Sequence, residues 1–323
     1  MPTSPGTRPE PPLPVRLDDL RPRGWPSPAV AIGNFDGVHL GHQALVRRIV
    51  ERARATTGSA VVLTFDPHPA RVLAPERAPE ALLTLEQRAE LLAGLGVDRL
   101  AVLPFDAAMA GLAPEAFAER VLAGALGARA VVVGEQFRFG RGRSGDVAML
   151  RAAGARLGFE VLSVAPVVEA GVRVSSSRVR AALAAGEVEL AGRLLGRLPF
   201  VDGRVVRGDG RGRQLGFPTA NLDVLNQALP GPGVYAAWCR LPDGRMHGAA
   251  ANVGRRPTFG GGDLTVEAHL LDHAGDLYDR TLRLSFVRRL REERRFDGGD
   301  ELARQIGADV HAARAALAEA RAL

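Results

Sequence analysis

Two histidines three residues apart are the side chains of this sequence best suited to phosphate chemistry. His39 and His42 stand in the segment GNFDGVHLGH (residues 33–42), between an apolar run at 28–32 and an amphipathic pattern that begins at about Gly41. The order predicts a strand, a tight turn and a helix N-terminus. Because the first N–H groups of a helix lack intrahelical partners, such a turn can bind an anion, and both imidazoles can donate to one phosphate.

A metal site and a purely structural histidine are the alternatives at this turn. A His-x-x-His pair could be half of a metal site, but no third ligand is nearby and the only cysteine is Cys239. A single histidine in this position would more often be a helix cap or a packed ring. We favour the interpretation that the two histidines are hydrogen-bond donors that stabilise charge on a reacting phosphate.

Composition restricts the class of protein. A length of 323 residues with 46% apolar residues predicts two globular domains, and no apolar run approaches a membrane span. One cysteine excludes a disulfide framework, so we expect a cytoplasmic location. The net charge of +6 suggests a protein that binds nucleic acid, but the basic residues are spread over both halves and aromatic residues are only 5% of the sequence. We therefore expect no nucleic-acid, membrane or obligatory protein partner.

The basic residues are of a single type. The sequence contains no lysine, so all 42 are arginine. A Walker P-loop needs a lysine that reaches the phosphates, so this class of phosphate site is excluded. Any phosphate here must be bound by arginine, histidine, backbone N–H groups or a metal ion.

The first half alternates between strand and helix patterns. A proline-rich tail at 1–14 is expected to be disordered, and the first domain extends over 15–186. Thr84 and Gln87 have capping-box spacing. Alternating strands and helices predict a Rossmann-like α/β domain with its ligand at the C-terminal strand ends. The strands are expected at 28–32, 60–65, 99–103, 130–133 and 160–164, and helices at 41 onward, 84–94, 114–122 and 146–157.

Three later stretches end on the same edge of the predicted sheet. They are TFDPHP (64–69), GEQFRFG (134–140) and VSSSRVR (174–180). The first two could be an ordinary proline turn and a solvated Gly/Arg loop. In the third, serines at a helix N-terminus offer hydroxyls and N–H groups, and Arg180 adds a charge suited to a triphosphate. A simple serine cap would explain one serine, not three.

The second half, 187–323, has the pattern of an antiparallel barrel. Its strands are expected at 200–207, 233–240, 246–253, 264–271 and 281–288, followed by a closing helix at 299–320. Residues 208–216 contain four glycines in a loop that could approach a ligand closely, although such loops are common in hairpins. Alternation on the strand at 264–271 places Glu267 on one face as a candidate general base. Pairing with one of the many arginines is its alternative.

These motifs together resemble bacterial bifunctional riboflavin kinase/FMN adenylyltransferases. GNFDGVHLGH and SSSRVR resemble the HxGH and ISSTxIR signatures, and TFDPHP, PTAN (218–221), 252–259 and 288–296 resemble further family segments. The resemblance implies that the barrel phosphorylates riboflavin to FMN with ATP, and that the α/β domain adenylylates FMN to FAD. It also implies Mg²⁺ as a cofactor.

The resemblance assigns roles residue by residue. His39 and His42 would be catalytic in the adenylyltransferase, and Glu267 in the kinase. Asp66 and His68 would lie near the flavin, and Thr219 and Asn221 would bind Mg²⁺. Gln136 departs from the asparagine or aspartate usual in the family. The implied nucleotide-binding residues of the adenylyltransferase are Gly33, Asn34, Phe35, Asp36, Gly41, Gln136, Ser175, Ser176, Ser177 and Arg180, and those of the kinase are Gly208, Gly210, Arg211, Gly212 and Gly216.

Two other functions are compatible with parts of the pattern. The α/β domain could belong to a different adenylyl- or cytidylyltransferase, although a PTAN barrel argues against that. A basic nucleic-acid-binding protein is the second, and salt-dependent binding to a duplex without ATP turnover would favour it.

Overall fold

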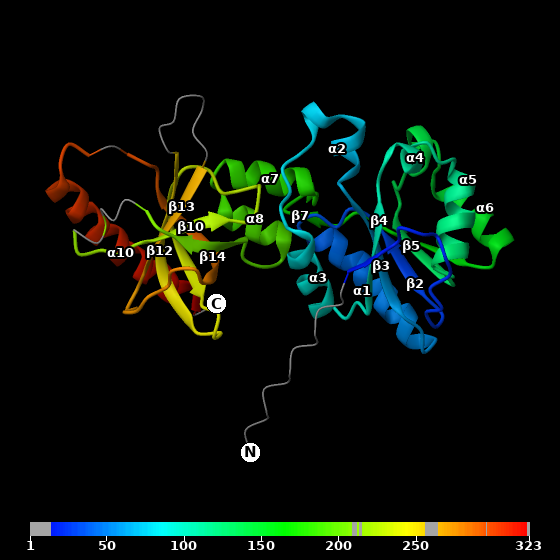
Figure 1. The fold of residues 1–323 in the computed structure, drawn as a ribbon, viewed down its shortest axis with the longest axis horizontal. Helices are drawn as coiled ribbons and strands as arrows, with labels where there is room; N and C mark the ends of the chain where they lie inside the picture. Colours follow the sequence, from blue (N-terminus) through cyan, green and yellow to red (C-terminus); the bar gives the residue numbers. More distant parts are fainter. Residues whose placement is uncertain (1–13, 209–211, 213–214, 256–263, 295, 322–323) are drawn as a thin grey trace, which may run out of the picture. The chain divides into compact units, whose positions relative to one another are not determined.

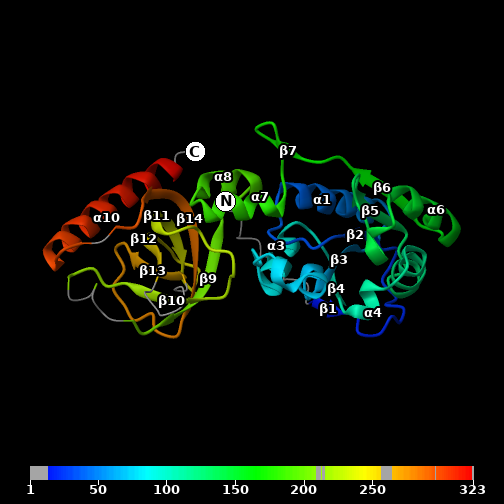
Figure 2. The same ribbon diagram turned by 90° about the horizontal axis from the view of Figure 1, so that it is seen from above.

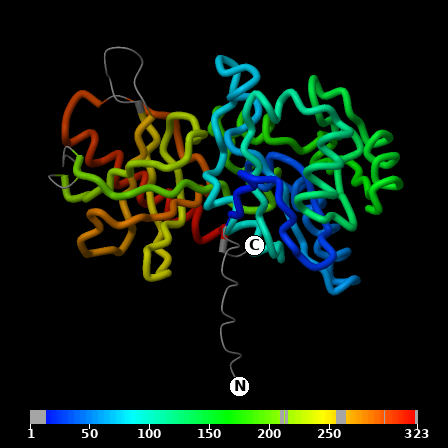
Figure 3. Tube along the Cα trace, turned by 45° about the vertical axis from the view of Figure 1, so that its right-hand side comes forward, coloured from blue at the N-terminus to red at the C-terminus, as the bar shows by residue number. Residues whose placement is uncertain are grey.

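The chain forms two compact units, Met1–Val174 and Ser175–Leu323. The structure is a computed structural model that describes residues 14–208, 212, 215–255, 264–294 and 296–321. Figure 3 traces the first unit in blue to green and the second in green to red. The tail predicted at 1–14 lies outside the described residues except for Pro14, which begins a strand.

The first unit is built on a six-stranded sheet whose strand pairs are all parallel (Figure 1). The alternating pattern predicts the parallel sheet and five of its strands, and the strand at Pro14–Arg16 was not predicted. Its order is β1-β4-β3-β2-β5-β6. The central strand β2 is buried along its whole length, which is why it reads as a continuous apolar run. The strands are β1 (Pro14–Arg16), β2 (Ala29–Ile32), β3 (Ala60–Asp66), β4 (Arg99–Pro104), β5 (Ala130–Gly134) and β6 (Glu160–Val164).

The strand order has a switch point beside β2. From β2 the chain proceeds through β3 to β4 on one side, and then returns to β5 and β6 on the other. Ligands of open α/β sheets bind at such a point, outside the carboxyl ends of the strands. The loop that follows β2 therefore occupies the position expected for a ligand site.

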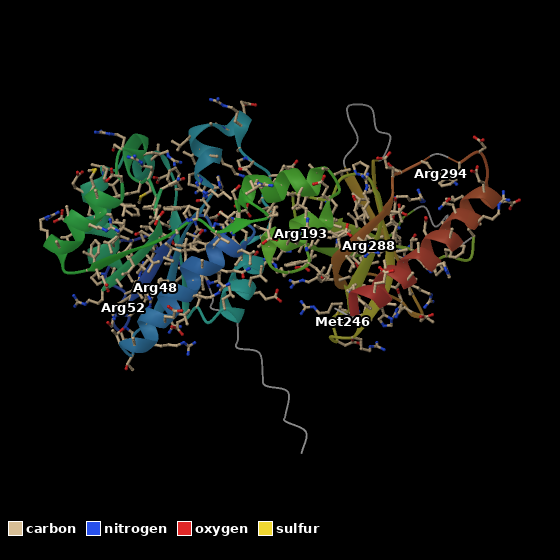
Figure 4. The ribbon with its side chains drawn as sticks, turned by 180° about the vertical axis from the view of Figure 1, so that it is seen from behind. Arg48, Arg52, Arg193, Met246, Arg288 and Arg294 are labelled. Carbon is tan, nitrogen blue, oxygen red and sulfur yellow. The ribbon has the colours of Figure 1, made fainter. Side chains whose placement is uncertain are left out.

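Helices connect these strands. α1 packs on β2, β3 and β5, and Arg48 and Arg52 mark its exposed side (Figure 4). The capping box predicted at Thr84 is confirmed, with both hydrogen bonds to Gln87 present. The helix predicted at 114–122 is a short α-helix that continues as a π-helix. The helices are α1 (Leu40–Ala55), α2 (Pro69–Leu73), η1 (Pro75–Arg77), α3 (Leu85–Gly94), α4 (Ala107–Ala110), α5 (Pro114–Phe117), η2 (Ala118–Ala125), η3 (Arg141–Arg143) and α6 (Val147–Leu157), before the hairpin of β7 (Val168–Glu169) and β8 (Val172–Arg173).

The second unit is a closed antiparallel barrel in the order β10-β13-β12-β11-β14-β9. Five of its strands match predictions, but β10 was missed because the sequence analysis treated its residues only as part of a motif. Helix α10 lies along β11 and β12 (Figure 2). The elements are α7 (Ser176–Ala184), α8 (Val188–Leu195), β9 (Phe200–Val206), β10 (Ala220–Val224), β11 (Gly233–Arg240), β12 (Met246–Arg255), β13 (Leu264–Leu270), β14 (Thr281–Arg291) and α10 (Gly299–Arg321).

Arginines of β14 attach the helices to the barrel. Arg291 donates to the buried Asp309 of α10 from Nε (2.8 Å) and from Nη2 (2.7 Å). Arg288, labelled in Figure 4, contacts Glu189 of α8 and Glu319 of α10. The bidentate geometry at Asp309 and its burial make this pair the stronger anchor, since exposed pairs contribute little.

Helix α7 belongs to the second unit. The Gly231 N–H donates to the Leu183 carbonyl (2.8 Å), and a Cβ on Gly231 would lie 2.4 Å from the Ala184 carbonyl oxygen. These contacts explain why the units divide after Val174, ahead of the boundary predicted at 186/187. The boundary at 186/187 between the two catalytic domains stays a prediction.

Candidate active sites

The turn between β2 and α1 is held in an unusual backbone conformation. Phe35 and Val38 have φ values of 49° and 42°, in the left-handed region that non-glycine residues rarely adopt. The Phe35 ring is fully buried, and Gln43 donates to the Val38 carbonyl (3.0 Å). Such conformations cost about 1–3 kcal/mol each and persist only where surrounding contacts impose them, most often at functional sites. We therefore expect Phe35 to shape the turn from within.

The two histidines of the turn are stacked on each other. Their ring centroids are 3.7 Å apart with an interplanar angle of 14°. His39 is the N-cap of α1, and its Nδ1 accepts from the His42 N–H (3.3 Å). Because Nδ1 accepts, the neutral His39 ring carries its proton on Nε2, where it can donate. The structure therefore shows that His39 is the helix cap, and its role as a phosphate donor stays a prediction.

Gly41 gives the His39 ring room on the first turn of α1. A Cβ at Gly41 would lie 3.1 Å from Cε1 and 3.2 Å from Nδ1 of that ring. The backbone carbonyl of Val174 is the next neighbour, at 3.9 Å. A side chain at position 41 would therefore press on the ring that caps the helix, which favours glycine between the histidines.

Asp36 contacts the protein backbone. Its carboxylate is buried and accepts from the N–H groups of Leu82 (3.0 Å) and Leu83 (3.2 Å). These residues directly precede the capping box of α3. The structure gives Asp36 a role in holding α3 to the turn, and its predicted contact with nucleotide stays a prediction.

The end of β3 also meets the turn. The side chains of Asn34 and His68 are 2.9 Å apart at Nδ2 and Nε2. His68 Nδ1 accepts from the Ala70 N–H (3.1 Å), so the neutral ring has its proton on Nε2 and must donate to Asn34. A proton on Nε2 pairs with an amide oxygen, so this contact is a hydrogen bond with the Asn34 amide turned by 180°, which exchanges Oδ1 and Nδ2. Asp66 instead pairs with Arg16 (3.3 Å).

Arg88 of α3 supports the turn and was missed by the sequence analysis. Its Nη1 donates to the Asn34 carbonyl (2.9 Å) and to Thr64 Oγ1 (3.3 Å). Burial lowers the pKa of the Arg88 guanidinium, and nearby carboxylates, Asp36 foremost, oppose that shift. Its sequence signal is an arginine spaced three and four residues from Leu85 and Leu92, on the apolar stripe of the helix.

The other predicted adenylyltransferase residues lie in two places. Gln136 is exposed on the loop after β5 and accepts a hydrogen bond from Arg173. Ser175 is the N-cap of α7, where its Oγ accepts from the Arg178 N–H (3.3 Å). The serine segment belongs to the second unit, so its approach to the histidines stays a prediction. That segment comprises Ser175, Ser176, Ser177 and Arg180.

The barrel aligns polar side chains on three adjacent strands. Asn221 of β10 and Asn252 of β12 are both Cα partners of Glu267 of β13. Directly opposed residues of antiparallel strands project on the same face. The flanking Val266 and Ala268 are buried, so the three polar side chains face away from the barrel interior. We call Asn221, Glu267 and Asn252 the polar row.

The glycine-rich segment contacts this face. A Cβ at Gly208 would lie 2.3–2.6 Å from the amide atoms of Asn221. A Cβ at Gly212 would lie 2.4 Å from the Phe217 carbonyl oxygen and 3.2 Å from Thr219 Oγ1. The two candidate Mg²⁺ ligands thus each lie against a glycine. Gly216 has a φ of 84°, whereas Gly210 and Arg211 lie outside the described residues.

Replacing Gly208 with alanine should disturb Asn221. The new methyl group would displace the flexible end of that side chain and leave the backbone in place, so the fold should survive. If the Asn221 amide binds a ligand, barrel activity should fall at least about tenfold, the effect of losing one hydrogen bond to a charged group. Gly192→Ala is the matched control, because its Cβ would meet only ordinary contacts at 3.6 and 3.7 Å. Equal barrel activity in the two variants would contradict a ligand role for Asn221.

The oxygen ligands available on the barrel suit a hard cation such as Mg²⁺ only when substrate phosphates complete its coordination. Among the described residues, no group of three or more His, Cys, Asp or Glu side chains could bind a metal ion. Thr219 and Asn221 supply oxygen atoms, and Mg²⁺ prefers oxygen ligands completed by water and substrate phosphates. The residues therefore fit Mg²⁺ bound as a nucleotide complex.

Within the part of the chain that the structure describes, no helix is long and apolar enough to cross a membrane.

A crystal structure described as a macrolide-efflux protein from Streptococcus pneumoniae is similar, with a TM-score of 0.85 and 32% identity over 93% of this chain and 98% of that chain. Its fold agrees with the one described here.

Comparisons with known families match both units. A FAD synthetase model matches residues 22–178 and a riboflavin kinase model matches residues 195–317. The bifunctional riboflavin kinase/FMN adenylyltransferase of Pseudomonas fluorescens is 45% identical over 94% of this chain and 96% of its own length. That of Escherichia coli K12 is 41% identical over 88% and 91%. With the histidine turn on the α/β unit and the polar row on the barrel, the chain belongs to the bifunctional riboflavin kinase/FMN adenylyltransferase family.

Proposed function

We propose that this protein makes FAD from riboflavin in two ATP-dependent steps, as the names of its relatives imply. The barrel would phosphorylate riboflavin to FMN, and the α/β unit would transfer AMP from a second ATP to FMN. The polar row carries this proposal, because it places a carboxylate beside two amides on rigid strands next to the glycine-rich segment.

In the kinase step, Glu267 would act as the general base. It would take the proton of the ribityl 5′-hydroxyl as that oxygen bonds to the γ-phosphorus of ATP. The bond from the γ-phosphorus to the β–γ bridging oxygen breaks, and ADP leaves. Thr219 and Asn221 would bind the Mg²⁺ of the ATP complex, which spreads the charge of the triphosphate.

In the adenylyltransferase step, positioning and charge stabilisation would be sufficient. A phosphate oxygen of FMN would attack the α-phosphorus of ATP, and pyrophosphate would leave in line. The Nε2–H of His39 and the ring of His42 would donate to oxygens on which negative charge increases. We expect Arg180 and the serines before it to bind the triphosphate.

The direct test is conversion of riboflavin. The purified protein is incubated with riboflavin, ATP and Mg²⁺, and the flavins are separated chromatographically. FMN should appear first and FAD second, and chelation of the metal should stop both reactions. Absence of FMN with intact protein would contradict the kinase proposal, and FMN without FAD would contradict the adenylyltransferase proposal.

The kinase should function without the first unit. A fragment that begins at Ser175 keeps the contacts of α7 with Gly231, so it should make FMN but no FAD. A fragment that begins at Ala185 lacks those contacts and should unfold at a lower temperature. Flavin chromatography and thermal unfolding of both fragments check this. A folded Ser175 fragment without kinase activity would contradict the assignment of the barrel.

A cytoplasmic location is proposed from cysteine chemistry. Cys239 is the only cysteine, and burial raises the pKa of its thiol to about 12. A buried, protonated thiol is inert, and a chain with one cysteine needs no oxidising compartment.

A further inference from the structure

His269 makes a contact that the proposed roles do not use. It lies on β13, two residues after Glu267, and its Nδ1 is 2.9 Å from the Pro218 carbonyl oxygen. A carbonyl oxygen only accepts, so Nδ1 carries the proton and donates. The Phe217 ring packs against the imidazole edge to face, with centroids 5.6 Å apart. The ring is therefore held by a polar and an aromatic contact.

This hydrogen bond acts on the peptide group that precedes Thr219. The register pairs Ala220 with Ala268 and Asn221 with Glu267, which places His269 level with Thr219. Because the peptide group is planar, fixing the Pro218 carbonyl also fixes the direction in which the chain enters Thr219. Pro218 has no N–H of its own with which the backbone could be anchored. Gly212 lies against the Thr219 side chain.

We propose that His269 is a positioning residue for the kinase reaction. Its Nδ1–H orients the peptide between Pro218 and Thr219, so that the Thr219 hydroxyl and the Asn221 amide present their oxygens together to the divalent cation of the ATP complex. The inference rests on the proposed kinase site. It gives His269 no part in proton transfer, which remains with Glu267.

Two amide substitutions distinguish the nitrogen atoms of the ring. In His269→Asn the amide nitrogen replaces Nδ1 as donor, whereas in His269→Gln it reaches the position of Nε2. His269→Ala and His269→Gln should raise the Mg²⁺ concentration for half-maximal kinase activity and the KM for ATP by about tenfold, with little change in kcat. His269→Asn should restore the half-maximal Mg²⁺ concentration and the KM for ATP to within about twofold of the wild-type values. Exposed His311 of α10 gives the matched control, His311→Ala.

Binding provides a readout that does not depend on turnover. The full chain is titrated calorimetrically with a non-hydrolysable ATP analogue in the presence of Mg²⁺. The binding event that disappears in the Thr219→Ala variant is assigned to the kinase site. That event should weaken about tenfold in His269→Ala and His269→Gln, and should persist in His269→Asn and His311→Ala. FAD formation from FMN and thermal unfolding, measured on each variant, report the integrity of the protein.

The outcomes separate this inference from the proposed site. If Thr219→Ala abolishes the event and kinase activity while His269→Ala behaves as wild type, the role of His269 is overturned and the site stands. If His269→Asn is as impaired as His269→Ala, the ring acts through something other than its Nδ1 donor, and the inference is equally overturned. If Thr219→Ala changes neither binding nor activity, the proposed site itself fails.

Discussion

Replacing Glu267 with glutamine should lower the kcat for riboflavin phosphorylation by about 10²–10⁴-fold, the contribution of a general base. Glutamine keeps the shape of the side chain within the polar row and can still hydrogen-bond, but it cannot take the proton of the ribityl hydroxyl. Affinity for ATP should change little, because the loss concerns the chemical step. Steady-state FMN formation, with KM and kcat determined separately, measures both.

A matched control distinguishes loss of the base from loss of a negative charge on the barrel. Glu319→Gln removes the charge of an exposed carboxylate of α10 that pairs with Arg288 at 2.8 Å. Because exposed pairs contribute about 0–1 kcal/mol, that variant should retain wild-type kinase kinetics. If Glu267→Gln were also close to wild type, the proposed base would be wrong.

Replacing His42 with alanine should lower FAD formation from FMN by roughly a hundredfold or more, the usual effect of losing one donor at a developing charge. FMN formation should be unaffected, because the kinase site lies on the barrel. Measuring both half-reactions on one protein preparation provides the comparison. A parallel loss of both activities would indicate misfolding.

His39 needs a different substitution because its ring also caps α1. His39→Asn keeps an N-cap oxygen for the His42 N–H, whereas His39→Ala removes the cap as well, at about 0.5–2 kcal/mol of stability. Both variants should lose FAD formation to about the same extent, but only His39→Ala should unfold at a clearly lower temperature. Wild-type FAD formation by His39→Asn would show that the cap is the only role of this residue.

The local structure of the turn between β2 and α1 could be predicted from sequence because its determinants are local. A strand, a turn and a helix N-terminus follow one another between Ala29 and Leu40, and His39 caps the helix that begins at Leu40. The capping box at Thr84 is equally local and is confirmed. Arg88 was missed because its partners, Asn34 and Thr64, are 54 and 24 residues away.

The kinase site illustrates the opposite case. The motif around Thr219 and Asn221 was visible, but β10 was not, since five residues beside a glycine-rich loop give a weak strand signal. Without β10 and its register, Asn252 could not be placed beside Glu267, and the contact of His269 with Pro218 could not be inferred.

The sequence by itself thus determined the kind of chemistry and the two fold classes, and the residues that carry each reaction stay predictions. Only the tertiary structure decided which atoms meet: the Asp36 carboxylate with the backbone just before α3, the Asn221 amide with Gly208, and the polar row across three strands. The physical reason is that helix caps and turns depend on neighbours in sequence, whereas strand register and side-chain burial are set by the packing of distant segments.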